Sequence, residues 1–147
     1  IVNLQGDLPL FDKNLLNGLI SLFDDDKVQI GTAVCDLEKE EVEDENIVKA
    51  KVELNKGIGY VNDFRRKISS KKNYYHHIGV YAFRAKILKK FINLPQSKNE
   101  VERKLEQLRA MDNNLTIKTI KVDYNPPSVD TIDDLKKIRL IYKKNNL

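Results

Sequence analysis

The chain has 147 residues, of which 41% are hydrophobic and 33% charged; this composition is typical of a folded globular protein and excludes a disordered chain. The net charge of +4 forms no basic block, because Lys and Arg are interleaved with 22 acidic residues, so we expect no nucleic-acid partner. No apolar run approaches the roughly 20 residues that span a bilayer, and the single cysteine, Cys35, excludes an internal disulfide, so we expect a cytoplasmic protein without a membrane partner.

The first half of the chain predicts strands that flank one amphipathic helix. In chain order we expect a strand over residues 1–4, a helix over 13–23, and strands over 28–34, 47–54 and 58–61. The first strand is short and apolar, which is typical of a buried strand in the middle of a sheet. Asp12 is placed to cap the helix, and the acidic residues 38–44 form a surface helix or loop.

The second half continues the mixture of strands and helices. In chain order it predicts a strand over residues 77–83, helices over 85–91 and 99–111, a strand over 115–122 and a terminal helix after residue 131. Val101, Leu105 and Leu108 are expected to face inward on the longer helix. Thr131 is expected to cap the terminal helix together with Asp134, three residues further on.

This order of elements indicates one α/β domain. Some strands are joined by hairpins and others by helical crossovers, which favours a three-layer architecture with a mixed sheet. No repeat, low-complexity tract or linker divides residues 1–147. The sequence begins with Ile1, and its single methionine is Met111, so we expect an N-terminally incomplete chain.

Two carboxylates are candidate ligands of a divalent cation. Asp7 follows the first strand, at the end where open α/β sheets bind their ligands, and Gly6 and Pro9 shape a tight turn around it. Asp130 comes from a separate loop before the terminal helix, and carboxylates from separate loops are the usual protein ligands of Mg²⁺. On spacing alone, an ordinary Asx turn is favoured for Asp7, and Asp130 fits a negative charge at a helix N-terminus.

Five segments stand in a fixed order along the chain. They are residues 1–9 (IVNLQGDLP), 46–49 (NIVK), 77–84 (HIGVYAFR), 105–109 (LEQLR) and 129–135 (VDTIDDL). These segments resemble, in the same order, the patterns I-V-N-x-Q-G-D-E-P, N-x-V-K, H-x-G-x-Y-x-Y-R, L-E-Q-L-R and V-D-T-x-x-D-L of the 3-deoxy-manno-octulosonate (Kdo) cytidylyltransferases. Each segment alone is weak evidence, but together they cover nearly the whole chain in register.

The resemblance implies a nucleotidyltransferase fold of the Rossmann-like, nucleotide-diphospho-sugar transferase type. Residues 1–147 would be the C-terminal two-thirds of a single cytidylyltransferase domain, without the N-terminal loop that binds the CTP phosphates. The implied reaction transfers CMP from CTP to Kdo and releases pyrophosphate, for lipopolysaccharide synthesis. The resemblance also implies Mg²⁺ held by the catalytic pair Asp7 and Asp130, and a homodimer built around residues 47–66. By themselves, residues 1–147 are expected to be inactive and poorly stable.

The resemblance further implies a set of sugar-binding residues. Its members would be Gln5, Arg66, His77, Tyr81, Glu106 and Gln107. His77 and Tyr81 lie four apart on one expected strand and therefore project from the same face, whereas His76 points to the opposite face. Arg66 would bind the sugar carboxylate through a bidentate pair, and Arg65 is an alternative because the spacing here is ambiguous.

Each of these side chains also has a purely structural interpretation. His77 fits a core histidine with satisfied hydrogen bonds, and Tyr81 fits a packed aromatic ring. The helix that carries Glu106 fits a solvated face, on which Arg103 and Arg109 pair with that carboxylate.

Departures from the family patterns leave other functions open. Leu8 stands where Glu is usual, Arg65 replaces Ser in an F-S-R pattern, and Lys98 and Asn99 replace Pro and Leu. One alternative is a cytidylyltransferase for another acidic sugar, such as a relative of sialic acid. The other alternative is a non-catalytic protein that has kept the same fold.

Overall fold

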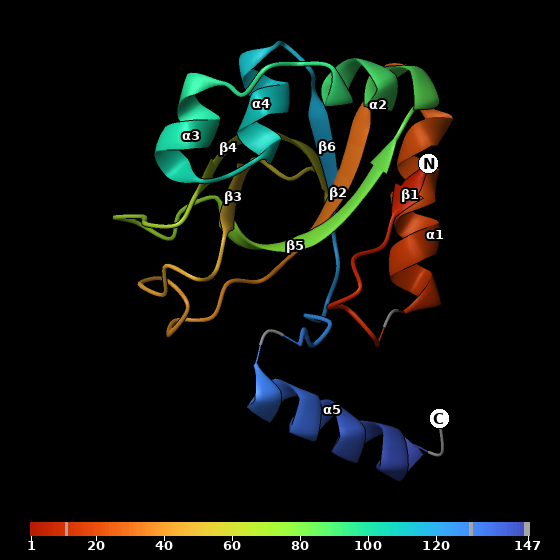
Figure 1. The fold of residues 1–147 in the computed structure, drawn as a ribbon, viewed down its shortest axis with the longest axis vertical. Helices are drawn as coiled ribbons and strands as arrows, with labels where there is room; N and C mark the ends of the chain where they lie inside the picture. The colour runs from red at the N-terminus through yellow and green to blue at the C-terminus, as the bar shows by residue number, and fades with distance from the viewer. Residues whose placement is uncertain (11, 130, 146–147) are drawn as a thin grey trace.

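The computed structural model describes residues 1–10, 12–129 and 131–145 (Figure 1). Within these ranges six strands form one sheet: β1 (Val2–Asn3), β2 (Ile30–Cys35), β3 (Lys49–Val52), β4 (Ile58–Arg65), β5 (Tyr74–Phe83) and β6 (Ile117–Lys121). The helices in the same ranges are α1 (Lys13–Ser21), the 3-10 helix η1 (Leu22–Asp24), α2 (Ala85–Ile92), α3 (Lys98–Arg103), α4 (Gln107–Asp112) and α5 (Ile132–Asn145).

The sheet is mixed, as the sequence predicts. Its strand order is β1-β5-β2-β6-β4-β3, in which β2 and β6 run parallel and the other neighbours run antiparallel. β3 and β4 form the expected hairpin, whose turn residues Lys56 and Gly57 have φ of 50° and 80°, as a tight two-residue turn requires. β4 is longer than expected and ends at Arg65, so the basic run that follows the hairpin begins inside this strand.

The strand β5 allows the sheet to close on itself. β2 pairs along one side of β5, while on the other side β3 pairs with the start of β5 and β1 with its end. Because β3 also pairs with β4, the strands β5, β2, β6, β4 and β3 form a closed ring, and the curved β5 is visible in Figure 1. An irregularity between Thr32 and Ala33 of β2 leaves Gly79 and Val80 of β5 without register partners, and bulges of this kind bend a strand.

Helices cover both faces of the sheet. On one face α1 begins at the expected cap, Asp12, and buries Leu15 and Leu19 against side chains of β2 and β5. On the other face α2 and α4 pack, through Phe91 and Leu108, against alternate residues of the same strands. Both faces are apolar because successive side chains of a strand point to opposite sides. The expected three-layer α/β fold is therefore confirmed.

The expected helix over residues 99–111 is wrong as a single element. It is divided into α3 and α4 because Lys104 adopts the left-handed conformation, with φ of 53°, and its amide donates to the carbonyl oxygen of Glu100. This geometry ends an α-helix. Leu105 and Leu108 are buried as expected, but Val101 lies on the outer side of α3 and is 58% exposed.

The expected first strand is present but lies in a different place. β1 comprises only Val2–Asn3 and, among the described strands, pairs with β5 alone, so it lies at the edge of this sheet and not in its middle. Its flanking residues Ile1 and Leu4 are exposed. An apolar run predicts burial only where the sheet provides neighbours on both sides, and here it provides one.

The terminal helix α5 lies beyond one end of the sheet (Figure 1). Its N-terminus has the expected cap: the hydroxyl of Thr131 accepts from the amide of Asp134 at 3.2 Å, and the Asp134 carboxylate accepts from the amide of Thr131 at 3.1 Å. The acidic residues 38–44, expected to form a surface helix or a loop, form turns and bends and are therefore a loop. None of the helices in the described ranges is long and apolar enough to cross a membrane.

Candidate functional site

Two neighbouring cavities share the side chain of Gln5. The first, here called the Tyr81 cavity, has a volume of about 560 Å³ and lies between β1, the end of β5, α2 and α4. The second, here called the Asp7 cavity, has a volume of about 600 Å³ and lies among the loop after β1, the acidic loop before β3 and the loop after β6. The candidate residues that the structure describes therefore fall into two groups that meet at Gln5.

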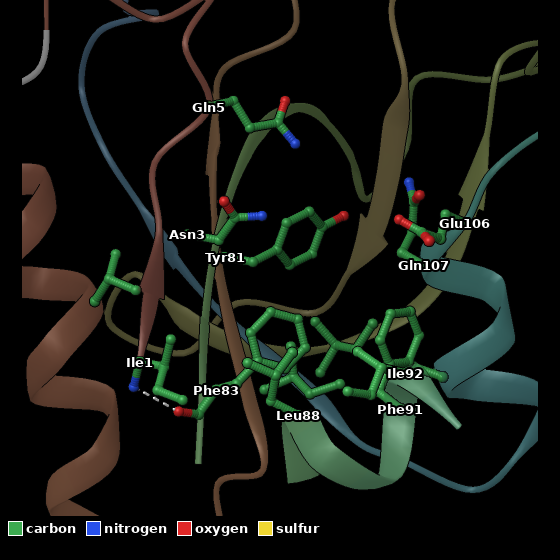
Figure 2. Close-up of a pocket in the computed structure, with 14 residues that line it drawn as sticks. Ile1, Asn3, Gln5, Tyr81, Phe83, Leu88, Phe91, Ile92, Glu106 and Gln107 are labelled. Carbon is green, nitrogen blue, oxygen red and sulfur yellow. Dashed lines mark hydrogen bonds between the residues drawn. The ribbon is translucent and has the colours of Figure 1, made fainter. Parts of the chain in front are cut away.

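The Tyr81 cavity has a polar half and an apolar half, as Figure 2 shows. The polar half contains Asn3, Gln5, Tyr81, Glu106 and Gln107. The apolar half contains Phe83, Leu88, Phe91 and Ile92. Such a cavity suits a small ligand that presents hydroxyl groups to one wall and carbon atoms to the other.

The hydroxyl group of Tyr81 has no hydrogen-bond partner among the described residues, although it is buried. Burial, and secondly the negative charge of Glu106, raise the pKa of this phenol above its ordinary value, so the hydroxyl stays protonated. Buried polar groups without partners are rare in folded proteins. A polar group of a ligand in the cavity would supply the missing partner.

The side chain of Glu106 is held at the cavity by Arg109 of α4. Nη2 of Arg109 contacts Oε1 of Glu106 at 3.2 Å and Oε1 of the buried Glu100 at 2.5 Å. The Arg109 guanidinium also lies over the ring of Phe91, at 5.1 Å from its centroid. The expected pairing of Arg109 with Glu106 is confirmed, whereas Arg103 instead pairs with Asp63 at 2.7 Å, because the break at residue 104 turns it away from α4.

Asp7 lines the second cavity, and its Oδ1 atom is buried without a hydrogen-bond partner in the described part of the chain. Its backbone carbonyl oxygen accepts a hydrogen bond of 2.8 Å from the amide of Val129. This bond joins the loop after β1 to the segment that leads into α5, although the two are more than a hundred residues apart.

Asp130, the second expected carboxylate, lies outside the described residues. Its predecessor Val129 contacts Asp7, as above, and Ser128 lines the Asp7 cavity. Over the described residues, no group of three or more His, Cys, Asp or Glu side chains is arranged to hold a metal ion.

His77 is buried at the wall of the Asp7 cavity. Its Nε2 atom lies 3.0 Å from the hydroxyl oxygen of Thr32, and its ring centroid lies 5.4 Å from that of Tyr81. The expectation that His77 and Tyr81 share a face of β5 is confirmed. Burial, and secondly the neighbouring His76, lower the pKa of His77 to about 3, so this imidazole is neutral.

The structure separates the two candidate arginines. Arg66 lines the Asp7 cavity, where its Nη1 atom donates to the carbonyl oxygens of Glu45 at 2.9 Å and Asn46 at 3.3 Å. Arg65 instead lines a third cavity and pairs with Asp63 at 2.6 Å. The guanidinium that shares a cavity with Asp7 is thus that of Arg66.

Two further residues of the site escaped the sequence analysis. Asn3 lies beside Gln5 in the polar half of the Tyr81 cavity, and the spacing of two residues, which puts both on one side of an extended chain, was the available signal. Gly79 of β5 lines the Asp7 cavity next to Gln5: a Cβ atom at residue 79 would stand 3.4 Å from Oε1 of Gln5, an ordinary van der Waals distance. No local pattern marks that contact, because the two residues are distant in sequence.

Comparison with known proteins decides the family. A family model described as "Cytidylyltransferase" matches residues 1–120. The chain belongs to the cytidylyltransferase family. This membership agrees with the resemblance in the five sequence segments and with the mixed sheet found here.

Two curated relatives carry the same name. The chain is 38% identical to a 3-deoxy-manno-octulosonate cytidylyltransferase of Paramagnetospirillum magneticum over 97% of its own length and 60% of the relative's. It is 38% identical to the protein of the same name from Thermodesulfovibrio yellowstonii, over 92% of the chain and 57% of the relative. The chain therefore spans less than two thirds of the length of these cytidylyltransferases.

Solved structures agree with the family assignment. A CMP:2-keto-3-deoxy-manno-octonic acid synthetase complexed with CTP superposes with a TM-score of 0.85 at 30% identity, over 98% of this chain and 61% of the other. An apo UDP-glucose pyrophosphorylase superposes with a TM-score of 0.66 at 18% identity, over 94% of this chain and 50% of the other. The second likeness shows the fold alone, and both place the chain in the nucleotidyltransferase fold.

Proposed function

We propose that the protein transfers CMP from CTP to the anomeric hydroxyl of Kdo and releases pyrophosphate, an activation step for lipopolysaccharide synthesis. The observation that carries this proposal is the partnerless hydroxyl of Tyr81 in a half-polar cavity that meets the Asp7 cavity at Gln5. Family membership, the relatives' names and the CTP complex of the structural neighbour support the choice of donor and acceptor.

The sugar acid would occupy the Tyr81 cavity and extend toward Asp7. Gln5, Tyr81, Glu106 and Gln107 would bond its hydroxyl groups from the polar half. Arg66 would bind the carboxylate of the sugar acid from the Asp7 cavity. Among the described residues, only Nη1 of this guanidinium contacts backbone oxygens, which leaves its other nitrogen atoms to donate to the ligand. His77, also assigned to the sugar, would contribute a neutral ring to the wall between the two cavities.

We assign Mg²⁺ to Asp7 and Asp130 as the catalytic pair. The donor set fits the ion, because carboxylate oxygens are the hard ligands that Mg²⁺ prefers and Oδ1 of Asp7 is buried without a partner in the described ranges. Bound there, Mg²⁺ would draw negative charge from the phosphate oxygens of CTP. The hydrogen bond from Val129 to Asp7 supports the pairing, since it attaches the segment leading to residue 130 to the loop of Asp7.

The reaction exchanges one phosphorus–oxygen bond for another. The anomeric oxygen bonds to the α-phosphorus of CTP, the bond from that phosphorus to the bridging oxygen breaks, and pyrophosphate leaves with the electron pair. The hydroxyl proton passes to water, and His77 is not its acceptor, because its pKa is near 3 and its Nε2 contacts Thr32. The side chains of the cavities act by holding the sugar acid in line with the phosphate.

The test is pyrophosphate release by the full-length protein. We expect release only when CTP, Kdo and Mg²⁺ are all present. Asp7→Asn is expected to lower kcat by about 100-fold or more, because the charge that holds the cation is lost. Asp36→Asn, which removes an exposed carboxylate paired with Lys121 outside both cavities, is the matched control and is expected to keep full turnover.

The same assay decides between the remaining functions. Faster turnover of N-acetylneuraminate than of Kdo would make the protein a cytidylyltransferase for that acid, a possibility raised by Leu8 in the wall of the Asp7 cavity. Binding of either acid without any turnover of CTP would make it a non-catalytic relative. Full activity of Asp7→Asn would remove the metal assignment and leave the substrate assignment standing.

The homodimer and the cytoplasmic location belong to the same proposal. The hairpin of β3 and β4, where the resemblance puts the dimer contact, carries the exposed apolar side chains Ile58 and Tyr60. The single cysteine, Cys35, is buried and unpaired, and burial raises the pKa of its thiol to about 12, which suits a reducing compartment. Sedimentation of the full-length protein at twice the monomer mass, and its recovery in the cytoplasmic fraction, would bear out these two statements.

A further inference from the structure

His76 connects two loops that line the Asp7 cavity. Its Nδ1 atom lies 2.9 Å from Oε1 of Glu41 in the acidic loop, and its Nε2 atom lies 3.3 Å from Nδ2 of Asn125 in the loop after β6. The side chains of His76 and Glu41 are 14% and 18% exposed, so the contact is largely shielded from water. His76 itself lies on β5, which is fixed by β2 on one side and β3 on the other.

The two partners suit one arrangement of donor and acceptor on the imidazole ring. An ionised carboxylate only accepts hydrogen bonds, so Nδ1 of His76 donates to Glu41. The amide nitrogen of Asn125 only donates, so Nε2 of His76 accepts. A ring that donates from Nδ1 and accepts at Nε2 makes both contacts.

The contact with Asn125 extends toward Asp7. Pro126 and Pro127 follow Asn125, and proline fixes φ near −65°, so this segment is stiff. Val129, four residues after Asn125, donates its amide proton to the carbonyl oxygen of Asp7 at 2.8 Å. This stiff segment therefore links the Asn125 contact to the backbone of Asp7.

The contact with Glu41 fixes the opposite wall. The second carboxylate oxygen of Glu41 accepts from the amide of Glu38 at 2.9 Å, which closes a turn of the acidic loop. The same loop ends at Glu45 and Asn46, whose carbonyl oxygens accept from Arg66. The imidazole of His76 thus contacts both the acidic loop, whose carbonyl oxygens bind Arg66, and the loop after β6, whose Val129 amide binds Asp7. These two loops are here called the Arg66 wall and the Asp7 wall of the cavity.

We propose that His76 is a positioning residue for the Asp7 cavity: through Glu41 and Asn125 it sets the distance between the Arg66 wall and the Asp7 wall. The role of His76 in turnover rests on the proposed function. Its stabilising effect on the Val129–Asp7 hydrogen bond does not. In this role His76 acts through the two loops that its ring contacts.

The first test measures the strength of the Val129–Asp7 hydrogen bond without any substrate. Hydrogen exchange of the Val129 amide would be measured by NMR in the full-length protein and in His76→Ala. Loss of one or both hydrogen bonds of His76 predicts a rate about three- to tenfold faster at this amide. His76→Gln, whose amide can donate to Glu41 and accept from Asn125, is expected to restore slow exchange. Tyr74→Ala, a truncation on the same strand away from both loops, is the control and is expected to leave Val129 unchanged.

The second test measures how pyrophosphate release depends on the Mg²⁺ concentration. His76→Ala and Asn125→Ala are each expected to raise the Mg²⁺ concentration for half-maximal pyrophosphate release about three- to tenfold with a small change in kcat, and the double variant is expected to resemble either single variant. Unchanged exchange at Val129 in His76→Ala, or additive effects in the double variant, would overturn the proposal. If the unaltered protein released no pyrophosphate, the proposed function would fail, while the exchange result would still decide the role of His76.

Discussion

Buried polar side chains in this protein fall into two groups that differ in their hydrogen bonds. Lys49 is fully buried, and burial lowers the pKa of its ammonium group, yet its Nζ atom donates to the carbonyl oxygens of Asp44 at 2.5 Å and Arg66 at 2.6 Å. Tyr81 and Asp7 each have a buried oxygen without a partner among the described residues. Lys49 holds the loops beside the Asp7 cavity, and the unsatisfied oxygens of Tyr81 and Asp7 lie where we propose that a ligand binds.

The hydroxyl of Tyr81 allows a prediction in which stability and binding change in opposite directions. An unpaired buried hydroxyl costs about 1–3 kcal/mol, so Tyr81→Phe is expected to leave the free energy of unfolding unchanged or to increase it. Because the ligand would lose one hydrogen bond, KM for Kdo is expected to rise about tenfold while KM for CTP changes little. Urea unfolding without ligand and steady-state kinetics measure the two quantities.

The control for this prediction is Tyr74→Phe, which removes a hydroxyl on the same strand outside the Tyr81 cavity. It is expected to alter neither quantity. A clear loss of stability in Tyr81→Phe, with KM for Kdo unchanged, would show that this hydroxyl has a structural partner and no ligand.

At the scale of elements, a chain of polar contacts ties α3 to α4 behind the Tyr81 cavity. Ser97 and Glu100 form a capping box at the start of α3, and the Glu100 carboxylate receives two hydrogen bonds from Arg109 of α4. Arg109 in turn contacts Glu106 at the cavity. The break at Lys104 makes this arrangement possible, because a continuous helix would not turn Glu100 and Arg109 toward each other.

Glu100 gives this link a definite dependence on pH. Hydrogen bonds from Arg109 hold the pKa of the Glu100 carboxyl below its ordinary value of 4.5, against the opposing effect of burial. A lowered folded-state pKa means that the pair stabilises the protein above pH 4.5 and that this stabilisation is lost as pH falls through the folded-state pKa. Glu100→Gln is expected to lower the free energy of unfolding at neutral pH by about 3 kcal/mol, since it leaves Arg109 without its buried partner.

Urea unfolding as a function of pH measures this effect, and the difference from the unaltered protein is expected to shrink in acid. Glu102→Gln is the matched control, because it removes an exposed carboxylate on the same helix, whose one ion pair among the described residues is with Lys98 at 3.8 Å. Exposed pairs contribute little, so its stability is expected to stay within about 0.5 kcal/mol. Equal losses in both variants, or a pH-independent loss in Glu100→Gln, would contradict the role given to the buried pair.

At the scale of the whole molecule, the ring of strands determines where the cavities lie. Closure through β3 and β5 brings the acidic loop, the start of β5 and the loop after β6 to one end, where they surround Asp7. β1 lies outside the ring and among the described strands pairs only with β5. Its open edge, with Ile1 and Leu4 exposed, is next to the Tyr81 cavity.

This exposed edge leads to a prediction for the 147-residue chain by itself. The chain spans 60% of a curated relative, and unpaired strand edges favour self-association, so we expect no turnover of CTP and a tendency to aggregate. The full-length protein is expected to be active and monodisperse under the same conditions. Pyrophosphate release and light scattering compare the two, and rapid turnover by residues 1–147 alone would contradict the expectation.

The sequence by itself determined most of the elements and the identity of the family. Amphipathic spacing marked α1, α2 and the strands, and capping residues marked the starts of α1 and α5, because these signals act between residues a few positions apart. The sequence did not predict the break between α3 and α4 at Lys104. The left-handed conformation there goes with the packing of Leu105 and with the Glu100–Arg109 pair, which are tertiary contacts. The five segments predicted Gln5, His77, Tyr81 and Glu106, and these residues do line the two cavities.

Only the tertiary structure decided how the site is assembled. It placed Arg66 rather than Arg65 in the wall of the Asp7 cavity, joined Val129 to Asp7, and left the oxygens of Tyr81 and Asp7 without partners in the described ranges. These facts depend on contacts between residues tens to more than a hundred positions apart. Hydrophobic periodicity reports which face of an element is buried, whereas the closure of the strand ring determines which buried faces meet.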